Sequence, residues 1–307
     1  MARYLVTGSA GMLGSSLRRL LGDEGAVYLT REDADLTNFE ATAALFRTHK
    51  PEFVIHCAAV VGGIGSNSIH SGEYFRNNIL INLNVLEAAR LSGVKRLISF
   101  MSTCVFPDKT PYPLNEQNLH NGAPHPSNFG YAYAKRMLEV QSAAYRKEWN
   151  CDFIVAIPTN MYGPHDDFAL EGGHVIPSLI HRTFLRQQAG EDLLAWGTGS
   201  PLREFVYVDD IARLTLWALE NYREEDAIIF SSGIERSIKE LVEIVADKMK
   251  FTGKIVWDST KPDGQFRKPS DTTKLRRLLP DFQFTPLDEG IEKSVAWFKA
   301  NYPNIRQ

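Results

Sequence analysis

Cysteine is scarce in this chain. Its 307 residues include three cysteines, Cys57, Cys104 and Cys151, which cannot all pair with one another and show no CxxC spacing. A disulfide framework and a structural zinc site are therefore not expected. Thiols that stay unpaired are typical of a reducing compartment, so a cytoplasmic location is expected.

Long apolar runs and an excess of charge are missing as well. No window of about 18 apolar residues occurs, so a membrane-spanning helix is not predicted. The first glycine, Gly8, comes too early for the apolar core of a signal peptide. Lys and Arg total 34 against 37 Asp and Glu, a formal net charge of −3. That balance gives no overall attraction to nucleic acid or to an anionic membrane.

The rest of the composition is ordinary. Hydrophobic residues make up 44% and charged residues 23%, which argues against long disordered segments. No internal repeat is found. The length suits two units of about 150 residues, or one large α/β domain with a lobe attached.

Short β-branched runs alternate with helical patterns through the first half of the chain. Such alternation predicts βαβ units, and hence a parallel sheet with helices on both faces. Ligands of such sheets bind beyond the carboxyl ends of the strands. We expect strands at 3–7, 26–30, 53–57, 96–101 and 152–157, and helices at 12–21, 39–46, 77–91 and 131–149.

The regular alternation ends near Pro158. Glycine-rich and charged stretches follow, and helices are expected only at 208–221, 237–250 and 286–301. We interpret the second half as a smaller, discontinuous lobe with a boundary near residue 160, part of which returns to the sheet.

A glycine-rich loop follows the first expected strand and leads directly into a helix. Glycines in that context allow a tight turn, close approach of the backbone to a diphosphate, and close packing of helix on strand. The helix N-terminus then offers free N–H groups to the anion. The loop reads Gly8-Ser9-Ala10-Gly11-Met12-Leu13-Gly14.

The tip of the second strand indicates which dinucleotide binds. An acid there would favour NAD through the ribose 2′-hydroxyl, whereas a cation favours the 2′-phosphate of NADP. The chain has Arg31 at this tip, which favours NADP. The alternative is a surface arginine paired with Glu32 or Asp33.

A second glycine-rich stretch could pass for another phosphate loop. It reads Gly62-Gly63-Ile64-Gly65 and does not precede a convincing helical pattern. We interpret it as a turn on the substrate side.

Tyr131 and Lys135 form a candidate proton-transfer pair. They stand four residues apart at the start of an expected helix, and therefore on one face of it. An ammonium beside a phenol favours the phenolate, so the tyrosine would exchange a proton near neutral pH. Ser102 follows a strand at the same edge of the sheet and could hydrogen-bond the reacting oxygen.

With these motifs the chain resembles the extended short-chain dehydrogenases/reductases. Within them it is similar to the branch that converts GDP-4-keto-6-deoxy-D-mannose to GDP-L-fucose by 3,5-epimerisation and NADPH-dependent 4-keto reduction. The resemblance implies a Rossmann-type doubly wound parallel sheet, with an NADP-binding domain at 1–160 and a mainly substrate-binding lobe at 161–307. The segments that carry it are 58–64, 102–107, 158–168, 174–177, 196–205 and 261–264.

The resemblance also implies which residues invert carbons 3 and 5. Cys104 and His174 match the family's acid–base pair, and both residue types can be moved toward a neutral pKa. If the segment from Ser102 to Cys104 is extended, both side chains face one pocket. Without the resemblance, Cys104 would be interpreted as a small buried hydrophobe and His174 as a loop residue.

Binding residues are implied in the same way. The substrate set is Asn160, Arg182, Trp196, Arg203 and Asp263, although Arg182, Trp196 or Asp263 alone would be equally compatible with a surface or packing role. No metal is expected, and helices 77–91 and 131–149 resemble those that pair in homodimeric relatives. The cofactor set is Gly8, Ser9, Ala10, Gly11, Met12, Leu13, Gly14, Arg31, Asp35, Leu36, Ala58, Ala59, Tyr131, Lys135, Pro158, Asn160, Met161 and His174.

Three other functions are compatible with parts of the pattern. A nucleotide-sugar 4-epimerase would retain its NAD without net consumption. A 4,6-dehydratase usually has an Asp-Glu pair near the Ser102 position, where this chain has Thr103-Cys104-Val105. A non-catalytic NADP sensor would often have lost Tyr131 or Lys135, and both are present.

Overall fold

The computed structural model describes residues 2–261, 263 and 265–307, without the side chain of Ile64. Two positions of the family segment 261–264, Pro262 and Gly264, lie outside the described residues. The chain forms two compact units. Unit 1 comprises the chain up to Thr110 with Asn115–Pro158 and Ile211–Phe230, and unit 2 comprises Pro111–Leu114, Thr159–Asp210 and the chain from Ser231 onward.

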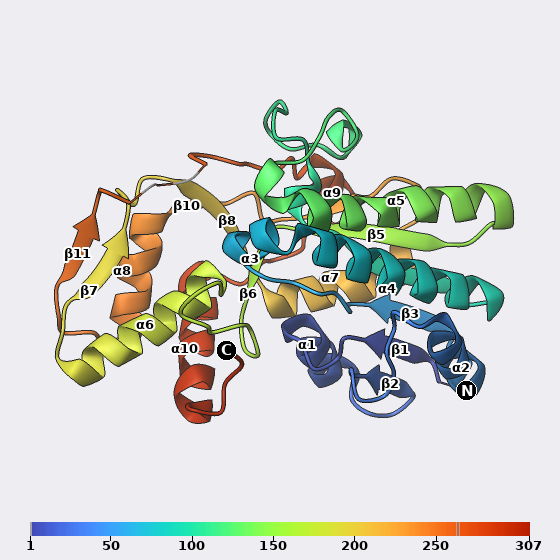
Figure 1. Ribbon diagram of the computed structural model, residues 1–307, viewed down its shortest axis with the longest axis horizontal. Coiled ribbons are helices and arrows are strands. Elements are labelled where there is room, and N and C mark those ends of the chain that lie inside the picture. The colour runs from blue at the N-terminus through green and yellow to red at the C-terminus, as the bar shows by residue number, and fades with distance from the viewer. Residues whose placement is uncertain (1, 262, 264) are drawn as a thin grey trace. The chain divides into compact units, whose positions relative to one another are not determined.

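Unit 1 is built on a parallel sheet (Figure 1). All its pairings are parallel, and β4 and β5 are buried along their whole length, as expected for central strands covered on both faces. Within the described residues the strand order is β2 (Ala26–Leu29), β1 (Tyr4–Thr7), β3 (Phe53–His56), β4 (Arg96–Phe100), β5 (Phe153–Pro158) and β9 (Ile228–Phe230).

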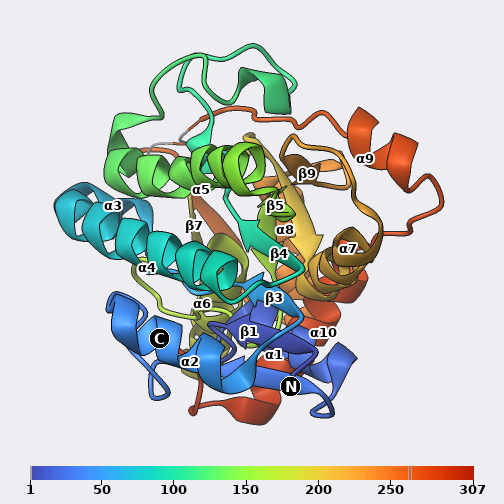
Figure 2. The same ribbon diagram turned by 90° about the vertical axis from the view of Figure 1, so that its right-hand side faces the viewer.

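Helices cover both faces of this sheet, which confirms the predicted α/β fold class. Figure 2 shows α2, α4 and α5 on one face and α1 and α7 on the other. None of the helices in the described part of the chain is both long and apolar enough to cross a membrane. The bounds are α1 (Met12–Leu21), α2 (Phe39–His49), α4 (Ser71–Leu91), α5 (Phe129–Trp149) and α7 (Val208–Asn221), with short 3₁₀ turns η1 (Thr103–Val105), η2 (Glu116–Asn118) and η3 (Pro126–Asn128).

The expectation of a plain turn at Gly62-Gly63-Ile64-Gly65 is wrong. A short helix, α3 (Ile64–Ile69), begins directly after Gly63. The buried Asn67 side chain donates to the carbonyls of Gly62 and Gly63 at 2.6 and 3.1 Å. These bonds stabilise the helical turn, and a periodicity search does not detect them because they come from one polar side chain.

Unit 2 contains two small sheets and four helices within the described residues. In the first sheet β8 (Leu202–Tyr207) pairs antiparallel with β10 (Glu235–Ser237) and parallel with β6 (Asn160–Tyr162). The second pairs β7 (Leu193–Trp196) with β11 (Ile255–Asp258). The helices are α6 (Val175–Ala189), α8 (Ile238–Met249), α9 (Thr273–Leu278) and α10 (Leu287–Asn301).

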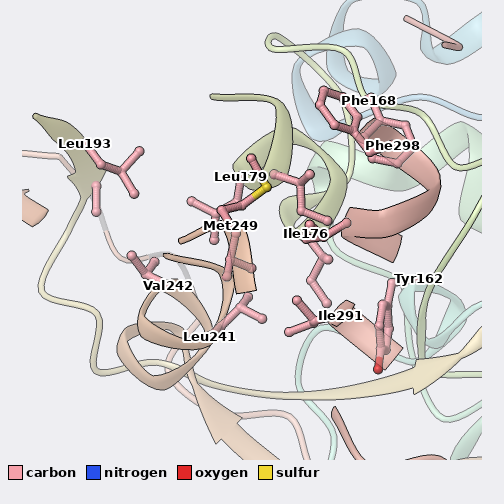
Figure 3. Packing of buried hydrophobic residues seen from close by; sticks show 14 of the residues in the cluster. Tyr162, Phe168, Ile176, Leu179, Leu193, Leu241, Val242, Met249, Ile291 and Phe298 are labelled. Carbon is pink, nitrogen blue, oxygen red and sulfur yellow. The ribbon is translucent and has the colours of Figure 1, made fainter. Parts of the chain in front are cut away.

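Unit 2 has a hydrophobic core of its own. Figure 3 shows Ile176 and Leu179 of α6, Met249 of α8 and Ile291 of α10 directed toward one another. Helix α6 was not expected from the sequence, where the stretch from Pro158 onward was interpreted as loop-like. Pro177 occupies the first turn of α6, where the missing N–H costs no intrahelical hydrogen bond.

Candidate active site

The glycine-rich loop leaves no room for side chains at two of its glycines. Gly8 has φ +67°, and a Cβ there would lie 2.7 Å from the backbone of Ala58. A Cβ at Gly14 would lie 2.4 Å from the Cα of Ser9. The N–H and the hydroxyl of Ser9 both donate to the Leu29 carbonyl at 3.0 Å, so the loop is tied to β2.

Helix α1 presents an open N-terminus at this loop. Gly11 is the N-cap, no side chain caps the helix, and its first turn contains no acid. The first N–H groups of a helix have no intrahelical partner, so they and the positive end of the helix dipole remain available to an anion. The close backbone approach at Gly8 and Gly14 and the uncapped helix together fit the diphosphate of a dinucleotide.

Arg31 lies exposed just after β2, and the neighbouring side chains of Thr30 and Asp33 hydrogen-bond to each other. The Asp33 carboxylate accepts from the backbone N–H and the hydroxyl of Thr30 at 2.7 and 2.9 Å. Within the described part of the chain no ion pair joins Arg31 to Glu32 or Asp33. The pairing considered as the alternative to NADP binding is therefore not formed.

The remaining predicted cofactor residues of unit 1 follow strands β2 and β3. Asp35 accepts from the backbone and hydroxyl of Thr37, and the Leu36 carbonyl accepts from Asn84 of α4 at 2.9 Å. Ala58 and Ala59 follow β3. All these residues therefore lie beyond the carboxyl ends of β2 and β3, the two strands that flank β1.

A buried polar chain joins β1 to α5 through β3 and α4. The Thr7 hydroxyl accepts from the Ala58 N–H and lies 2.8 Å from His56 Nδ1. His56 Nε2 lies 3.1 Å from Asn82 Oδ1, and Asn82 donates to the Ala134 carbonyl at 3.2 Å. Burial lowers the pKa of His56 to about 3, so the imidazole is neutral. The neutral Nε2–H tautomer lets every donor in the chain meet an acceptor.

Tyr131 and Lys135 lie on α5 as predicted. The Lys135 side chain is buried, and desolvation lowers the pKa of its ammonium to about 8, although the nearby thiols of Cys57 and Cys104 favour the charged form. The Tyr131 ring packs edge-on against Tyr74 of α4 at 6.5 Å between centroids.

The expectation that the pKa of Tyr131 is lowered in the free protein is wrong. Burial raises it, and the charge of Cys104 and then the proximity of Tyr74 raise it further. Phenolate loses more solvation on burial than phenol does, so Tyr131 is a neutral phenol at pH 7. A neutral phenol is suited to donating a proton rather than accepting one.

Ser102 and Cys104 lie at the carboxyl end of β4, but the segment between them is not extended. Ser102 is the extended N-cap of the 3₁₀ turn η1, and its Oγ accepts weakly from the Cys104 N–H at 3.5 Å. The extended geometry that was expected to direct both side chains into one pocket is therefore absent. The turn nevertheless places Cys104 where its charge interacts with Tyr131 and Lys135.

In unit 2, His174 is the N-cap residue of α6 and forms a dyad with a buried acid. Its Nδ1 donates to Asp166 Oδ1 at 2.8 Å, with the histidine side chain 52% exposed and the aspartate side chain 3% exposed. The pKa of His174 is raised, and the hydrogen bond to Asp166 is the largest cause. The second carboxylate oxygen of Asp166 is buried and has no hydrogen-bond partner among the described residues. The imidazole Nε2 is left for an external partner.

Two cations lie near the ring of Trp196 at the end of β7. The Arg182 guanidinium lies 5.6 Å and the Lys261 ammonium 5.7 Å from the centre of its ring. The indole is 59% exposed. Arg182 also lines a surface hollow of about 310 Å³ with Arg186 and Glu191. This arrangement fits an anionic ligand with a flat ring.

The other predicted substrate residues of unit 2 lie on its strands and turns. Asn160 of β6 is exposed and donates to the Glu204 carbonyl at 2.8 Å, and Arg203 of β8 donates to the Leu202 carbonyl at 2.7 Å. Both oxygens of Asp263 accept from Thr198, at 2.7 and 2.8 Å. Asp263 therefore stabilises the turn after β7.

Two further predicted cofactor residues lie just before and just after the point where the chain passes from unit 1 to unit 2. Pro158 ends β5, and Met161 is in the middle of β6. Between them the chain passes through Thr159, whose hydroxyl is buried and has no hydrogen-bond partner among the described residues.

Comparison with known proteins shows which family the chain belongs to. The model of the NAD dependent epimerase/dehydratase family matches residues 4–231. The chain belongs to this family. Within it, the chain is 44% identical to a GDP-L-fucose synthase of Dictyostelium discoideum over 99% of this chain and 97% of the relative. It is 42% identical to a probable GDP-L-fucose synthase of Drosophila melanogaster over the full length of both.

A solved structure has the same fold. The GDP-L-fucose synthetase of Naegleria fowleri bound to NADP superimposes with a TM-score of 0.95 at 40% identity, covering 99% of this chain and 94% of that one. The match extends over both units.

Several residues that shape the site were missed by sequence reasoning. Asp166 lies within a family-like segment but has no motif of its own, and its pairing with His174 depends on the turn between them. Lys261 lies within the family-like segment 261–264, but nothing in the sequence indicates its contact with Trp196. His56 and Asn82 are 26 positions apart, so only the packing of β3 against α4 brings them together.

The Asp166–His174 dyad makes a prediction about pH. Asp166→Asn should lower the pKa of His174, because the largest influence raising it is removed. The charged pair stabilises the fold fully below the unfolded-state pKa of about 6.5, and this stabilisation is lost as pH rises through the raised native pKa. The variant should lose that dependence. Histidine NMR titration measures the pKa, and thermal unfolding against pH measures the stability.

Asp167→Asn is the matched control for the dyad. Asp167 also raises the pKa of His174, but as a smaller influence and without the hydrogen bond. Its effect should be the smaller of the two. An unchanged His174 titration in Asp166→Asn would show that the pairing does not exist in solution.

Proposed function

We propose that this protein converts GDP-4-keto-6-deoxy-D-mannose to GDP-L-fucose in two steps, 3,5-epimerisation and NADPH-dependent reduction of the 4-ketone. One observation carries the proposal: the thiol of Cys104 interacts electrostatically with both Tyr131 and Lys135. A reductase pair and a group able to abstract carbon-bound protons therefore occupy one site. Full-length similarity to GDP-L-fucose synthases supports the same substrate.

The epimerisation follows from the substrate's acidity. The ketone at carbon 4 acidifies the C–H bonds at carbons 3 and 5, and removal of either proton gives an enolate. Inversion needs a base on one face and an acid on the other. We assign these two roles to Cys104 and to His174, whose pKa Asp166 raises.

The reduction uses the neutral phenol of Tyr131. NADPH, when bound, supplies the hydride to carbon 4. Tyr131 gives its proton to the developing alkoxide, and its raised pKa keeps that proton in place at neutral pH. Lys135 stabilises the tyrosine and the nicotinamide ribose, and Ser102 orients the oxygen.

The binding roles follow from the loop and from the cations. The uncapped N-terminus of α1 holds the cofactor diphosphate, and Arg31 holds the 2′-phosphate. In unit 2, Arg182 and Arg203 take the GDP diphosphate, Trp196 covers a ring, and Asn160 and Asp263 contact hydroxyls.

The other family activities differ in what they require. A 4-epimerase or a 4,6-dehydratase does not need net NADPH oxidation, and a sensor needs no turnover. Incubation with NADPH and GDP-4-keto-6-deoxy-D-mannose separates them, because only the proposed reaction oxidises NADPH while producing GDP-L-fucose. The absence of NADPH oxidation in folded protein would contradict the proposal.

The two chemical steps should be separable by substitution. Tyr131→Phe should reduce NADPH oxidation by about 10²–10⁴-fold, the usual contribution of general acid catalysis. It should leave solvent deuterium exchange at carbons 3 and 5 partly intact. Cys104→Ser should instead strongly slow exchange, and any residual reduction should give an unepimerised or partly epimerised sugar. NMR of the products formed in deuterium oxide measures both steps.

Cys151→Ser is the control for the cysteine variant. Cys151 is also a free thiol but follows α5 at its far end, so both steps should be retained. If Cys104→Ser still exchanges both protons at the original rate, the base is another residue.

Arg31 should determine the cofactor preference. Arg31→Gln should weaken NADPH binding by about 1.5–3 kcal/mol, the value of a hydrogen bond to a charged group, and leave NADH binding unchanged. Fluorescence titration with each cofactor measures the difference, with the exposed Arg47→Gln of α2 as control. Equal affinity of the unmodified protein for NADPH and NADH would refute the preference.

The remaining parts of the proposal are a cytoplasmic location and a homodimer. Three free cysteines fit a reducing compartment. Helices α4 and α5 lie side by side and expose large apolar side chains, among them Leu83, Leu91, Val140 and Trp149. A pair of such helices from two copies would bury them as a four-helix interface.

A charge on this surface should separate the dimer. Sedimentation at micromolar concentration should show a dimer for the unmodified protein and a monomer for Leu83→Glu, because burying a carboxylate among apolar side chains is costly. Leu20→Glu on α1, with a similarly exposed leucine, should remain dimeric. A monomeric unmodified protein would refute the homodimer.

A further inference from the structure

Arg136 is a buried cation next to the site. It follows Lys135 on α5 and is 3% exposed. Its Nε donates to the Val105 carbonyl at 3.0 Å, its Nη2 donates to the same carbonyl, and its Nη1 donates to the Gly122 carbonyl at 2.8 Å. The guanidinium therefore holds the end of the turn that carries Cys104.

The charge of Arg136 has no carboxylate partner among the described residues. A guanidinium stays protonated in a protein interior, and an isolated buried charge is costly. The titratable groups that interact with it are Tyr133, whose ring centre lies 5.2 Å away, and Cys104. Cys104 in turn interacts with Tyr131 and Lys135 of the same helix. The thiolate of Cys104 is the anion best placed to balance the two cations.

We propose that Arg136 is a positioning residue that holds the Cys104 turn against α5 and stabilises Cys104 as the thiolate. The catalytic consequence rests on the proposed function, in which Cys104 is the base. A thiolate is the form that removes protons, so Arg136 acts on epimerisation through Cys104 and leaves the proton of Tyr131 in place. The ionisation of Cys104 itself is a property of the protein without substrate or cofactor.

A purely structural role is the alternative. Arg146, on the same helix, provides the matched control because it also donates to two backbone carbonyls, of Glu225 and Phe153, at 2.8 and 2.6 Å. It does not contribute to the pKa of Cys104's neighbours Tyr131 and Lys135. A loss of helix anchoring alone should affect both variants alike.

The test is the rate of alkylation of Cys104 by iodoacetamide against pH, resolved from the other cysteines by peptide mass spectrometry. The rate follows the thiolate fraction. In the unmodified protein the midpoint should lie below the ordinary thiol value of about 8.5. Arg136→Gln should raise it by about one pH unit or more and slow alkylation at pH 7 about ten-fold. Arg146→Gln should leave it unchanged.

Arg136→Lys separates charge from position. It keeps the cation but loses the two-pronged bond to Val105. The midpoint should stay near that of the unmodified protein. The rate of deuterium exchange at carbons 3 and 5 should lie between that of Arg136→Gln and that of the unmodified protein.

Three results would overturn the proposal. The first is a midpoint at or above about 8.5 in the unmodified protein, which decides the matter even if Arg136→Gln does not fold. The second is an unchanged midpoint in folded Arg136→Gln, and the third is an equal shift in Arg146→Gln. Absence of turnover with the GDP-sugar would contradict the proposed function but not the alkylation profile, so the two failures are distinguishable.

Discussion

The placement of two consecutive cations, Lys135 and Arg136, in the interior of unit 1 is the constraint on which the site depends. Both are less than 5% exposed, and transferring a charge out of water is costly unless other groups replace the solvent. The two residues meet this cost differently. Lys135 holds its proton less tightly, with a pKa near 8, whereas Arg136 keeps its charge and donates to backbone carbonyls. Both interact with Cys104, so the cations that α5 buries define the electrostatics of the thiol.

The nucleotide loop and the reactive helix are connected within the same unit. The chain from Thr7 through His56 and Asn82 to the Ala134 carbonyl passes from β1, across β3 and α4, to the residue before Lys135. A neutral His56 satisfies its neighbours without adding a third positive charge near the ammonium. The strand that leads into the phosphate loop and the helix that carries Tyr131 are thereby held in register by buried polar groups, each of which would be costly to leave unpaired.

Unit 2 has a hydrophobic core of its own and carries polar groups around it. Its helices α6, α8 and α10 pack around apolar side chains such as Ile176 and Phe298 (Figure 3). Asp166, buried beside the N-terminus of α6, orients His174. The cations around Trp196 come from α6 and from the loop after β11, so a ligand there would contact elements distant in sequence.

The sequence by itself determined the parallel sheet, the glycine loop and the shared helix face of Tyr131 and Lys135, because periodicity and close spacing are local properties. Cys104 became a candidate only through the family resemblance. The loop glycines were predictable from their place between a strand and a helix, although the contacts that require them differ. A Cβ at Gly14 would meet Ser9 within the loop, whereas a Cβ at Gly8 would meet Ala58, which follows β3. Only the tertiary structure decided the protonation states. Burial reversed the expected pKa shift of Tyr131, the turn η1 replaced the extended segment after Ser102, and Asp166 and Arg136 acquired their roles through contacts that no spacing encodes. Desolvation and hydrogen bonding depend on what packs around a group, and that is defined only when the strands and helices come together.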